Sequence, residues 1–161
     1  MSFIKKILGK TSASNDMNIF DGEEFGMKKA IKKAQQGYAS FEKEMKVESR
    51  RIVPGFTECF LKYAFKVEVS GLDYEHMFIS DLYHDGVKMI GTLASEPQYA
   101  KNFKEGDEIE IDPKFVSDWL YILNDEVCGG FTFRYMWSKF TTKEKLVYIK
   151  FPPFSYLKLT T

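Results

Sequence analysis

The sequence predicts an α+β domain in which a long N-terminal amphipathic helix packs on a curled antiparallel β-sheet of five to six strands. Three observations support this prediction. A long helical apolar period occurs only in the first third of the chain, period-two alternation starts after it, and turn pairs such as Asp85-Gly86 and Gly106-Asp107 recur between short apolar runs. A helix followed by consecutive strands is the order of an α+β fold.

The helix is predicted from Glu23 to about Val47. Apolar residues recur there at intervals of three and four, which places them on one face; they are Met27, Ile31, Ala34, Tyr38, Phe41 and Met45, with Ala30 widening the stripe. Asp21 suits the N-cap, and Glu24 lies with Glu23 in the first turn, where the helix dipole favours acidic side chains.

The polar face of this helix carries four lysines, Lys28, Lys29, Lys32 and Lys33. Such a face suits either solvent or an anionic surface of nucleic acid or membrane. Because no aromatic residues are interleaved with the lysines, we interpret it as a solvated surface.

Strands are expected after Val53-Pro54-Gly55 ends the helical region. Apolar residues at 61, 63, 65, 67 and 69 alternate with mostly polar ones, which predicts a strand with one buried face. A second strand is expected over 74–84, and Asp85-Gly86 is the residue pair of a type I′ turn that would return the chain antiparallel. The remaining strands are predicted over 87–93, 108–111, 119–123 and 127–135.

The last part of the chain is predicted to be a short helix and an aromatic tail. Thr141 or Thr142 can cap a helix that extends to Tyr148 and that Pro152-Pro153 must stop. The tail residues Phe154, Tyr156 and Leu157 are expected to dock on the body of the protein. In total, we expect residues 1–20 to form an N-terminal segment and linker, and residues 21–161 to form a single α+β domain.

Composition and charge narrow the functional classes. The 161 residues suit one folded domain, and Cys59 and Cys128 lie outside any CxxC or His-containing cluster, so we expect reduced thiols and no metal. No stretch approaches the roughly 20 apolar residues of a membrane span, and the first ten residues lack the apolar core of a signal peptide. We therefore expect a cytoplasmic protein.

A net charge of zero hides an uneven distribution. Residues 68–126 hold 4 Lys/Arg against 14 Asp/Glu, or −10, while residues 1–67 and 127–161 each carry +5. Such an acidic patch repels nucleic acid and attracts basic partners, unless the basic ends fold over it and neutralise it. The acidic residues expected to bind a partner are Glu96, Glu105, Asp107, Glu108, Glu110, Asp112, Asp125 and Glu126.

No pattern in the sequence marks an enzyme. It contains no G-x-S-x-G elbow, phosphate-binding glycine loop or zinc spacing, so we expect no catalytic set and no cofactor. His76 beside Glu75 could form a base with an orienting carboxylate, but adjacent strand residues point to opposite faces, which favours a structural histidine. His84 would share a face with His76, too far away to bind one metal ion.

One group of residues suggests a ligand pocket as an alternative hypothesis. A carboxylate, an indole and a guanidinium, those of Asp118, Trp119 and Arg134, could line a pocket together with Thr132 and His76. The same residues could instead form a buried ion pair that sets strand register.

Five short segments, in order, resemble a known family. They are EHMFISDL (75–82), GTLASEP (91–97), KEGDEIEI (104–111), SDWLYI (117–122) and GGFTFR (129–134). Their order and spacing, with the preceding helix, resemble the bacterial YegJ-like domain family DUF2314 over about residues 23–134. The family has no established catalytic residues to carry over.

The resemblance sets the functional expectation. Related small domains occur beside secreted bacterial toxins as cognate immunity proteins, which implies a protein that binds a toxin directly through its acidic segment. The alternative is a small-ligand binding or sensor domain with a pocket around Asp118, Trp119 and Arg134. We expect a protein partner and neither nucleic acid nor membrane; the oligomeric state cannot be inferred from the sequence.

Overall fold

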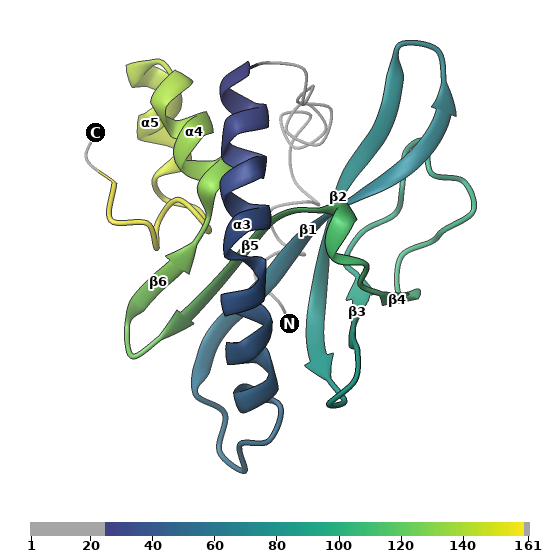
Figure 1. Cartoon of the computed structure of the whole chain (residues 1–161). Coiled ribbons are helices and arrows are strands. Elements are labelled where there is room, and N and C mark those ends of the chain that lie inside the picture. Colours follow the sequence, from purple (N-terminus) through teal and green to yellow (C-terminus); the bar gives the residue numbers. More distant parts are fainter. Residues whose placement is uncertain (1–24, 160–161) are drawn as a thin grey trace.

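A computed structural model describes residues 25–159 as one long helix, an open six-stranded antiparallel sheet and two shorter helices (Figure 1). The α+β fold class is confirmed. The elements are α3 (Phe25–Glu48), β1 (Phe56–Val69), β2 (Leu72–His84), β3 (Met89–Leu93), β4 (Glu108–Glu110), a 3-10 turn η1 (Pro113–Phe115), β5 (Val116–Leu123), β6 (Glu126–Gly129), α4 (Phe131–Lys139) and α5 (Thr142–Tyr148). The predicted N-cap Asp21, the first-turn residues Glu23 and Glu24, and the linker of residues 1–20 lie outside the described residues.

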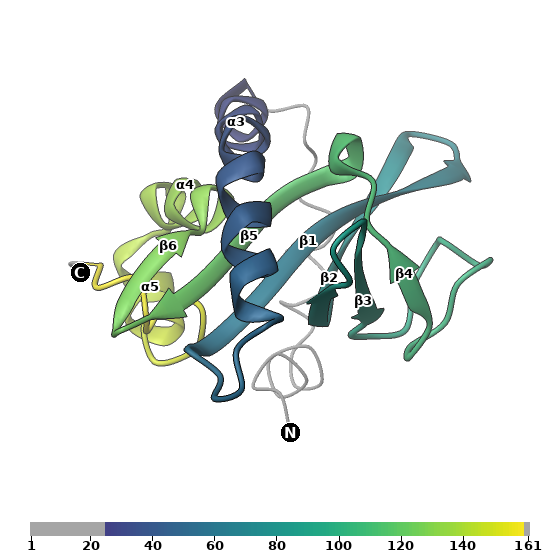
Figure 2. The ribbon, with the colours of Figure 1, turned by 60° about the horizontal axis from the view of Figure 1, so that its bottom comes forward.

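The strand order in the sheet is β4-β3-β2-β1-β5-β6, so β4 and β6 form its two edges. Figures 1 and 2 show α3 running along one face over β5 and β1, with α4 beside the N-terminal half of α3. The predicted apolar stripe of α3 makes this contact, because six of its residues are buried: Met27, Ala30, Ala34, Tyr38, Phe41 and Met45.

The two faces of the sheet carry separate apolar clusters. On the face toward α3, Leu61 and Trp119 are cross-strand partners, and Phe41 of α3 stacks on Trp119 with ring centroids 5.1 Å apart. On the other face, Phe60 and its partner Leu120 pack with α4, α5 and the tail. Both faces of the central strands are therefore covered, and the predicted docking of the tail is confirmed by two buried residues, Phe154 and Leu157.

The segment predicted as the strand 127–135 is the main error in the predicted elements. The strand ends at Gly129, and Phe131–Lys139 forms α4. Gly129 and Gly130 have φ angles of 83° and 76°, left-handed values that glycine adopts readily and that turn the chain out of the sheet. A Cβ on Gly129 would also lie 2.1 Å from the Trp119 carbonyl oxygen, so only glycine fits there.

The hairpin turn at Asp85-Gly86 differs in type from the prediction. Asp85 N donates to Lys88 O (3.1 Å), and only Gly86 among these turn residues has a positive φ, 101°. The central residues are therefore Gly86-Val87, with glycine first as in a type II′ turn. Positive φ at both central residues, which a type I′ turn needs, occurs instead between β5 and β6 at Asn124 (51°) and Asp125 (62°).

The two histidines of β2 lie on opposite faces, not on one face as predicted. The pairing of β2 with β3 shifts register between Ser80 and Tyr83, and Asp81 has a φ of 50°. Such an irregularity reverses the alternation of side chains beyond it. His84 therefore faces α3, where its Nε2 lies 3.3 Å from Glu42 Oε1, while His76 faces the opposite side and lies 3.0 Å from Ser117 Oγ.

Candidate functional site

Six of the eight acidic residues predicted to bind a partner come together at one edge of the sheet. We call this group the acidic edge: Glu96, Glu105, Asp107, Glu108, Glu110 and Asp112. All six are exposed except Asp107, which is half-buried. Asp125 and Glu126 are also exposed, but they belong to the β5–β6 turn at the opposite edge, so the structure separates them from the other six.

Part of the acidic edge stabilises its own turns. Glu96 Oε2 accepts a hydrogen bond from Glu105 N (2.9 Å), and Asp107 Oδ2 accepts one from Lys104 N (3.0 Å). Glu110 forms a surface ion pair with Lys88, Nζ to Oε2 2.9 Å. An exposed ion pair contributes little to stability, about 0–1 kcal/mol, so this carboxylate remains available to a partner.

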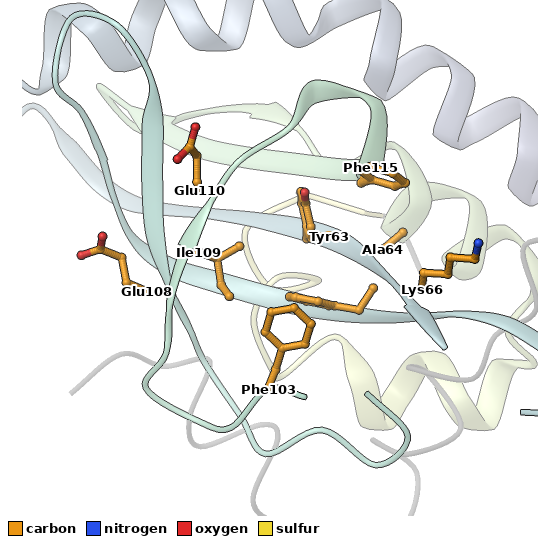
Figure 3. Close-up of a pocket in the computed structure, with 9 residues that line it drawn as sticks. Tyr63, Ala64, Lys66, Phe103, Glu108, Ile109, Glu110 and Phe115 are labelled. Atoms are coloured by element: carbon orange, nitrogen blue, oxygen red, sulfur yellow. The ribbon is translucent and has the colours of Figure 1, made fainter. Parts of the chain in front are cut away.

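An aromatic cleft of about 330 Å³ lies directly beside the acidic edge (Figure 3). Four rings form an arc around it: Phe103 contacts Phe65 (centroids 4.8 Å apart), Phe65 contacts Tyr63 (5.1 Å), and Tyr63 contacts Phe115 (6.1 Å). Tyr63 and Phe65 form a buried floor, while Phe103 is 37% exposed. We define the aromatic cleft by these four rings and Ile109.

The rim of the aromatic cleft carries charge of both signs. Glu108 and Glu110 alternate with the inward-facing Ile109 along β4, and Figure 3 shows their carboxylates directed away from the rings. Lys66 lies on the other side of the cleft. All three charged side chains are exposed, so they can change rotamer on a picosecond-to-nanosecond timescale.

The cleft is open because α3 does not extend over this end of the sheet. Figures 1 and 2 show α3 over β5 and β1, whereas β3 and β4 lie to one side of it. The loop between β3 and β4 covers part of this end, and a buried carboxylate holds it. Glu75, 3% exposed, accepts backbone hydrogen bonds from Gln98 (2.7 Å), Tyr99 (2.8 Å) and Ala100 (2.8 Å). Glu75 is therefore an anchor for the loop that carries Phe103.

The alternative pocket residues belong mostly to a buried polar cluster on the opposite face. Asp118 is 0% exposed and accepts four hydrogen bonds: Oδ1 from Trp119 N (2.8 Å) and Phe131 N (3.1 Å), and Oδ2 from Thr132 N (2.8 Å) and Thr132 Oγ1 (2.6 Å). Gly130 at the N-cap of α4 has no side chain to cap the helix. Asp118 supplies that cap from β5, and its negative charge suits the helix N-terminus.

Lys62 and His76 complete the polar cluster, which we define as Lys62, His76, Ser117, Asp118 and Thr132. Lys62 is the cross-strand partner of Asp118, is only 5% exposed, and places its ammonium 5.7 Å from the centroid of the Phe133 ring. The sequence pattern predicted a solvated lysine at this position. It is buried because α4 covers the second face of the sheet.

Burial governs the titration of the polar cluster. Desolvation lowers the pKa of Lys62 and raises the pKa of Asp118, and each charge opposes the shift of the other. Burial and the nearby Lys62 ammonium lower the pKa of His76 to about 4. Ser117 Oγ donates to Lys62 O (3.1 Å), so at the 3.0 Å contact with Ser117 Oγ the neutral imidazole is the donor, through Nδ1.

The structure does not assemble the predicted pocket. Asp118 and Thr132 are buried and bonded to each other, and Trp119 donates from Nε1 to Ala34 O (2.9 Å) on the α3 side of the sheet. Arg134 is exposed on α4, where its Nε contacts Gly129 O at 3.4 Å. Asp118 and Arg134 therefore form no ion pair, and the role of Asp118 is helix capping instead of fixing register with an arginine.

The aromatic cleft was missed at the sequence level. Its floor residues Tyr63 and Phe65 were predicted correctly as the buried face of a strand, but nothing in that strand indicates that Phe103 and Phe115 frame the same hollow. Phe103 gives a weak local signal, because it is an aromatic residue between Lys101 and Lys104 in a segment that leads to the Gly106 turn.

These features define a single-sheet α+β domain with helices on both faces, and among residues 25–159 no group of acidic, histidine and cysteine residues could hold a metal ion. The chain belongs to the family described as "Uncharacterized protein conserved in bacteria (DUF2314)", whose profile matches residues 24–151. This confirms the family that the five segments indicated. No helix within the described part of the chain is long and apolar enough to cross a membrane.

Two curated proteins are similar to this chain. A protein of Neisseria meningitidis serogroup B named "Putative ankyrin repeat protein" is 30% identical over 118 residues, which is 73% of this chain and 47% of that protein. "Uncharacterized protein YegJ" of Escherichia coli K12 is 31% identical over 58 residues, 36% of this chain and 38% of its own length. The chain thus spans less than half of either relative. No solved structure matches it.

Proposed function

We propose that this protein is a cytoplasmic immunity protein that neutralises a cognate bacterial toxin by direct binding. The observation that carries the proposal is the position of the acidic edge directly beside an uncovered aromatic cleft. Both features belong to the same end of the sheet, so one partner surface can contact them together.

This arrangement has the composition of a protein interface. Protein interfaces are enriched in aromatic residues at their centre, where a few side chains supply most of the binding energy, while charged residues form the rim. Here Phe103 and Phe115 would supply the centre, and Glu108 and Glu110 part of the rim. Acidic rims accelerate association with basic partners.

The charge of the acidic edge indicates which kind of toxin would fit. Toxins that act on nucleic acid or other anionic substrates need a basic surface at their active site. An acidic protein that covers this surface would compete with the substrate electrostatically and sterically. We therefore propose a toxin with a basic active-site surface as the partner.

The name of one relative is compatible with a role in protein recognition. The matched Neisseria protein is named as an ankyrin repeat protein, and stacked repeats of this type form extended concave binding surfaces. A domain of this family next to such repeats would take part in protein binding, as we propose for the present chain.

The alternative function, binding of a small ligand around Asp118, Trp119 and Arg134, has less support. Asp118 is fully buried and its carboxylate is occupied by four hydrogen bonds, and Arg134 lies away from it on the surface of α4. If a small ligand binds, the aromatic cleft is the better place, because its volume of about 330 Å³ falls within the range of ligand pockets, roughly 300–1,000 Å³.

Co-expression with the product of the neighbouring gene tests the proposed function. We expect the two proteins to co-purify and this protein to rescue growth from the toxicity of that product. The charge-reversal pair Glu108→Lys and Glu110→Lys should abolish rescue, whereas Asp125→Lys and Glu126→Lys, the same charge change at the opposite edge, should leave it intact. If the unmodified protein neither forms a complex with that product nor rescues growth, the proposal is contradicted.

A further inference from the structure

We infer that the aromatic cleft is the receptor for one arginine side chain of the partner. This inference rests on the proposed binding of a basic protein and adds to it the chemical group that enters the cleft. It concerns only the group that enters the four-ring arc and the charged residues that border it, whereas the proposed function concerns the acidic edge and the cleft together as one protein interface.

The first step of the argument is the chemistry of the cleft walls. The Phe103–Phe65–Tyr63–Phe115 arc offers aromatic surface, and Phe103 is exposed enough for a ligand to contact it. Aromatic faces attract cations, and an arginine guanidinium, which is planar and weakly hydrated, stacks on them better than a lysine ammonium does. A volume of about 330 Å³ accommodates one long side chain.

The second step is the charge at the rim. Glu108 and Glu110 stand two residues apart on β4 on either side of Ile109, so two exposed carboxylates border the cleft. The guanidinium fork suits carboxylates because it can donate to them in parallel. At Glu110 the guanidinium would displace the Lys88 ammonium, whose ion pair with Glu110 is exposed and therefore weak.

Lys66 makes the charge of the bound side chain testable, which a purely apolar pocket would not allow. Its exposed ammonium borders the same cleft and would repel an arriving cation. Removing this charge should therefore strengthen the binding of a cationic side chain. The same change should weaken the binding of an anionic one and leave that of an apolar one unchanged.

A peptide titration of the full-length protein tests the inference without the toxin. The probe is the capped tripeptide Ac-Gly-Arg-Gly-NH₂, and the control is the same peptide with citrulline, a neutral side chain of nearly identical shape. We expect the arginine peptide to shift the nuclear magnetic resonance signals of Phe103, Ile109 and Phe115 with weak but saturable affinity. The citrulline peptide should bind at least about threefold more weakly, as expected for an exposed cation–π contact.

Variants then separate the aromatic and electrostatic contributions. Phe103→Leu keeps an apolar side chain and should fold normally, but it removes the ring face, so the affinity for the arginine peptide should fall about two- to fivefold. Lys66→Gln should raise this affinity about twofold or more. Phe25→Ala, which removes an exposed aromatic residue from α3, is the matched control and should change nothing.

The outcomes distinguish this inference from the proposed function. Selective arginine binding in the cleft supports the inference even if no toxin partner is found. Equal binding of the arginine and citrulline peptides, or weaker arginine binding in Lys66→Gln, overturns it. A toxin complex that forms normally with Phe103→Leu, while the arginine peptide shifts residues elsewhere, would also overturn it and would leave the proposed function standing.

Discussion

At the scale of single residues, Asp118 connects the sheet to α4. Its two carboxylate oxygens accept four hydrogen bonds inside the protein, two of them from the first backbone N–H groups of α4. We expect Asp118→Ala to lower the free energy of unfolding by about 3–5 kcal/mol, because buried donors and the Lys62 ammonium lose their acceptor and counter-charge.

The isosteric variant Asp118→Asn separates charge from hydrogen bonding. An amide has a single acceptor oxygen, so either Trp119 and Phe131 or Thr132 would face an NH₂ group, and the expected loss is about 1–3 kcal/mol. Urea denaturation followed by circular dichroism measures both variants. A loss below about 0.5 kcal/mol in Asp118→Ala would show that α4 does not depend on this cap.

His76 predicts a pH dependence of stability. Its pKa is about 4 in the folded protein, against 6.5 in the unfolded chain, because burial and the Lys62 charge disfavour the imidazolium. Between these two pH values the unfolded state binds the extra proton. The contribution of His76 to the free energy of unfolding is therefore fully present above pH 6.5 and is lost as the pH drops toward 4. The expected loss is on the order of 3 kcal/mol.

The variant His76→Asn isolates this contribution, because its amide can still donate to Ser117 but does not titrate. Urea unfolding midpoints measured at intervals from pH 7 to pH 4 should decline less steeply in the variant than in the unmodified protein. Parallel declines would mean that other groups dominate the acid response, such as Asp85 and Glu144, whose pKa values are lowered by backbone hydrogen bonds.

At the scale of elements, the β3–β4 loop is held by one buried side chain. Glu75 accepts three backbone hydrogen bonds from residues 98–100, and the same loop positions Phe103 in the aromatic cleft. Glu75→Gln replaces one acceptor oxygen with a donor. We therefore expect the free energy of local opening of the loop to fall by about 1–3 kcal/mol, so that the loop opens more often.

Hydrogen exchange measures this loosening at the affected amides. Exchange at Tyr99 and Ala100 should accelerate strongly in Glu75→Gln, while the amides of β5 remain protected. If exchange accelerates equally throughout the sheet, Glu75 stabilises the whole fold and not the loop alone.

The elements also show what a sequence pattern can and cannot predict. The helix α3 was predictable because its apolar stripe, from Met27 to Met45, persists over about five turns, long enough to exclude a strand. The helix α4 was not, because Phe131, Phe133 and Tyr135 alternate at period two in a short segment. The cap that decides its helical state comes from Asp118, 13 and 14 residues earlier in the chain.

The candidate site, like the helices, was predictable from the sequence only in part. The exposure of the acidic residues could be expected from their charge, but their division between two edges depends on the strand order, which places β4 and β6 at opposite ends of the sheet. The burial of Lys62 depends on which helix covers the second face. The aromatic cleft depends on where α3 ends over the sheet. These are consequences of tertiary packing, which local periodicity does not encode.

At the scale of the whole molecule, the net charge of zero combines an acidic middle segment with basic ends. Six acidic residues remain gathered at the acidic edge in the folded protein, and five of them are exposed. The basic stretches within residues 25–159 therefore do not bury this part of the acidic segment. The molecule presents a local negative field without an overall charge.

A local field of this kind predicts how association with a basic partner depends on salt. The Debye length shortens from about 30 Å at 0.01 M to about 10 Å at 0.1 M ionic strength, so the association rate constant should fall over this range, while the dissociation rate constant changes little. Stopped-flow fluorescence at several salt concentrations measures both. Glu108→Gln with Glu110→Gln should flatten the salt dependence, whereas Asp125→Asn with Glu126→Gln, an equal loss of charge at the opposite edge, should leave it nearly unchanged. Equal slopes for the two double variants would assign the attraction to total charge, and the acidic edge would then not be the docking surface.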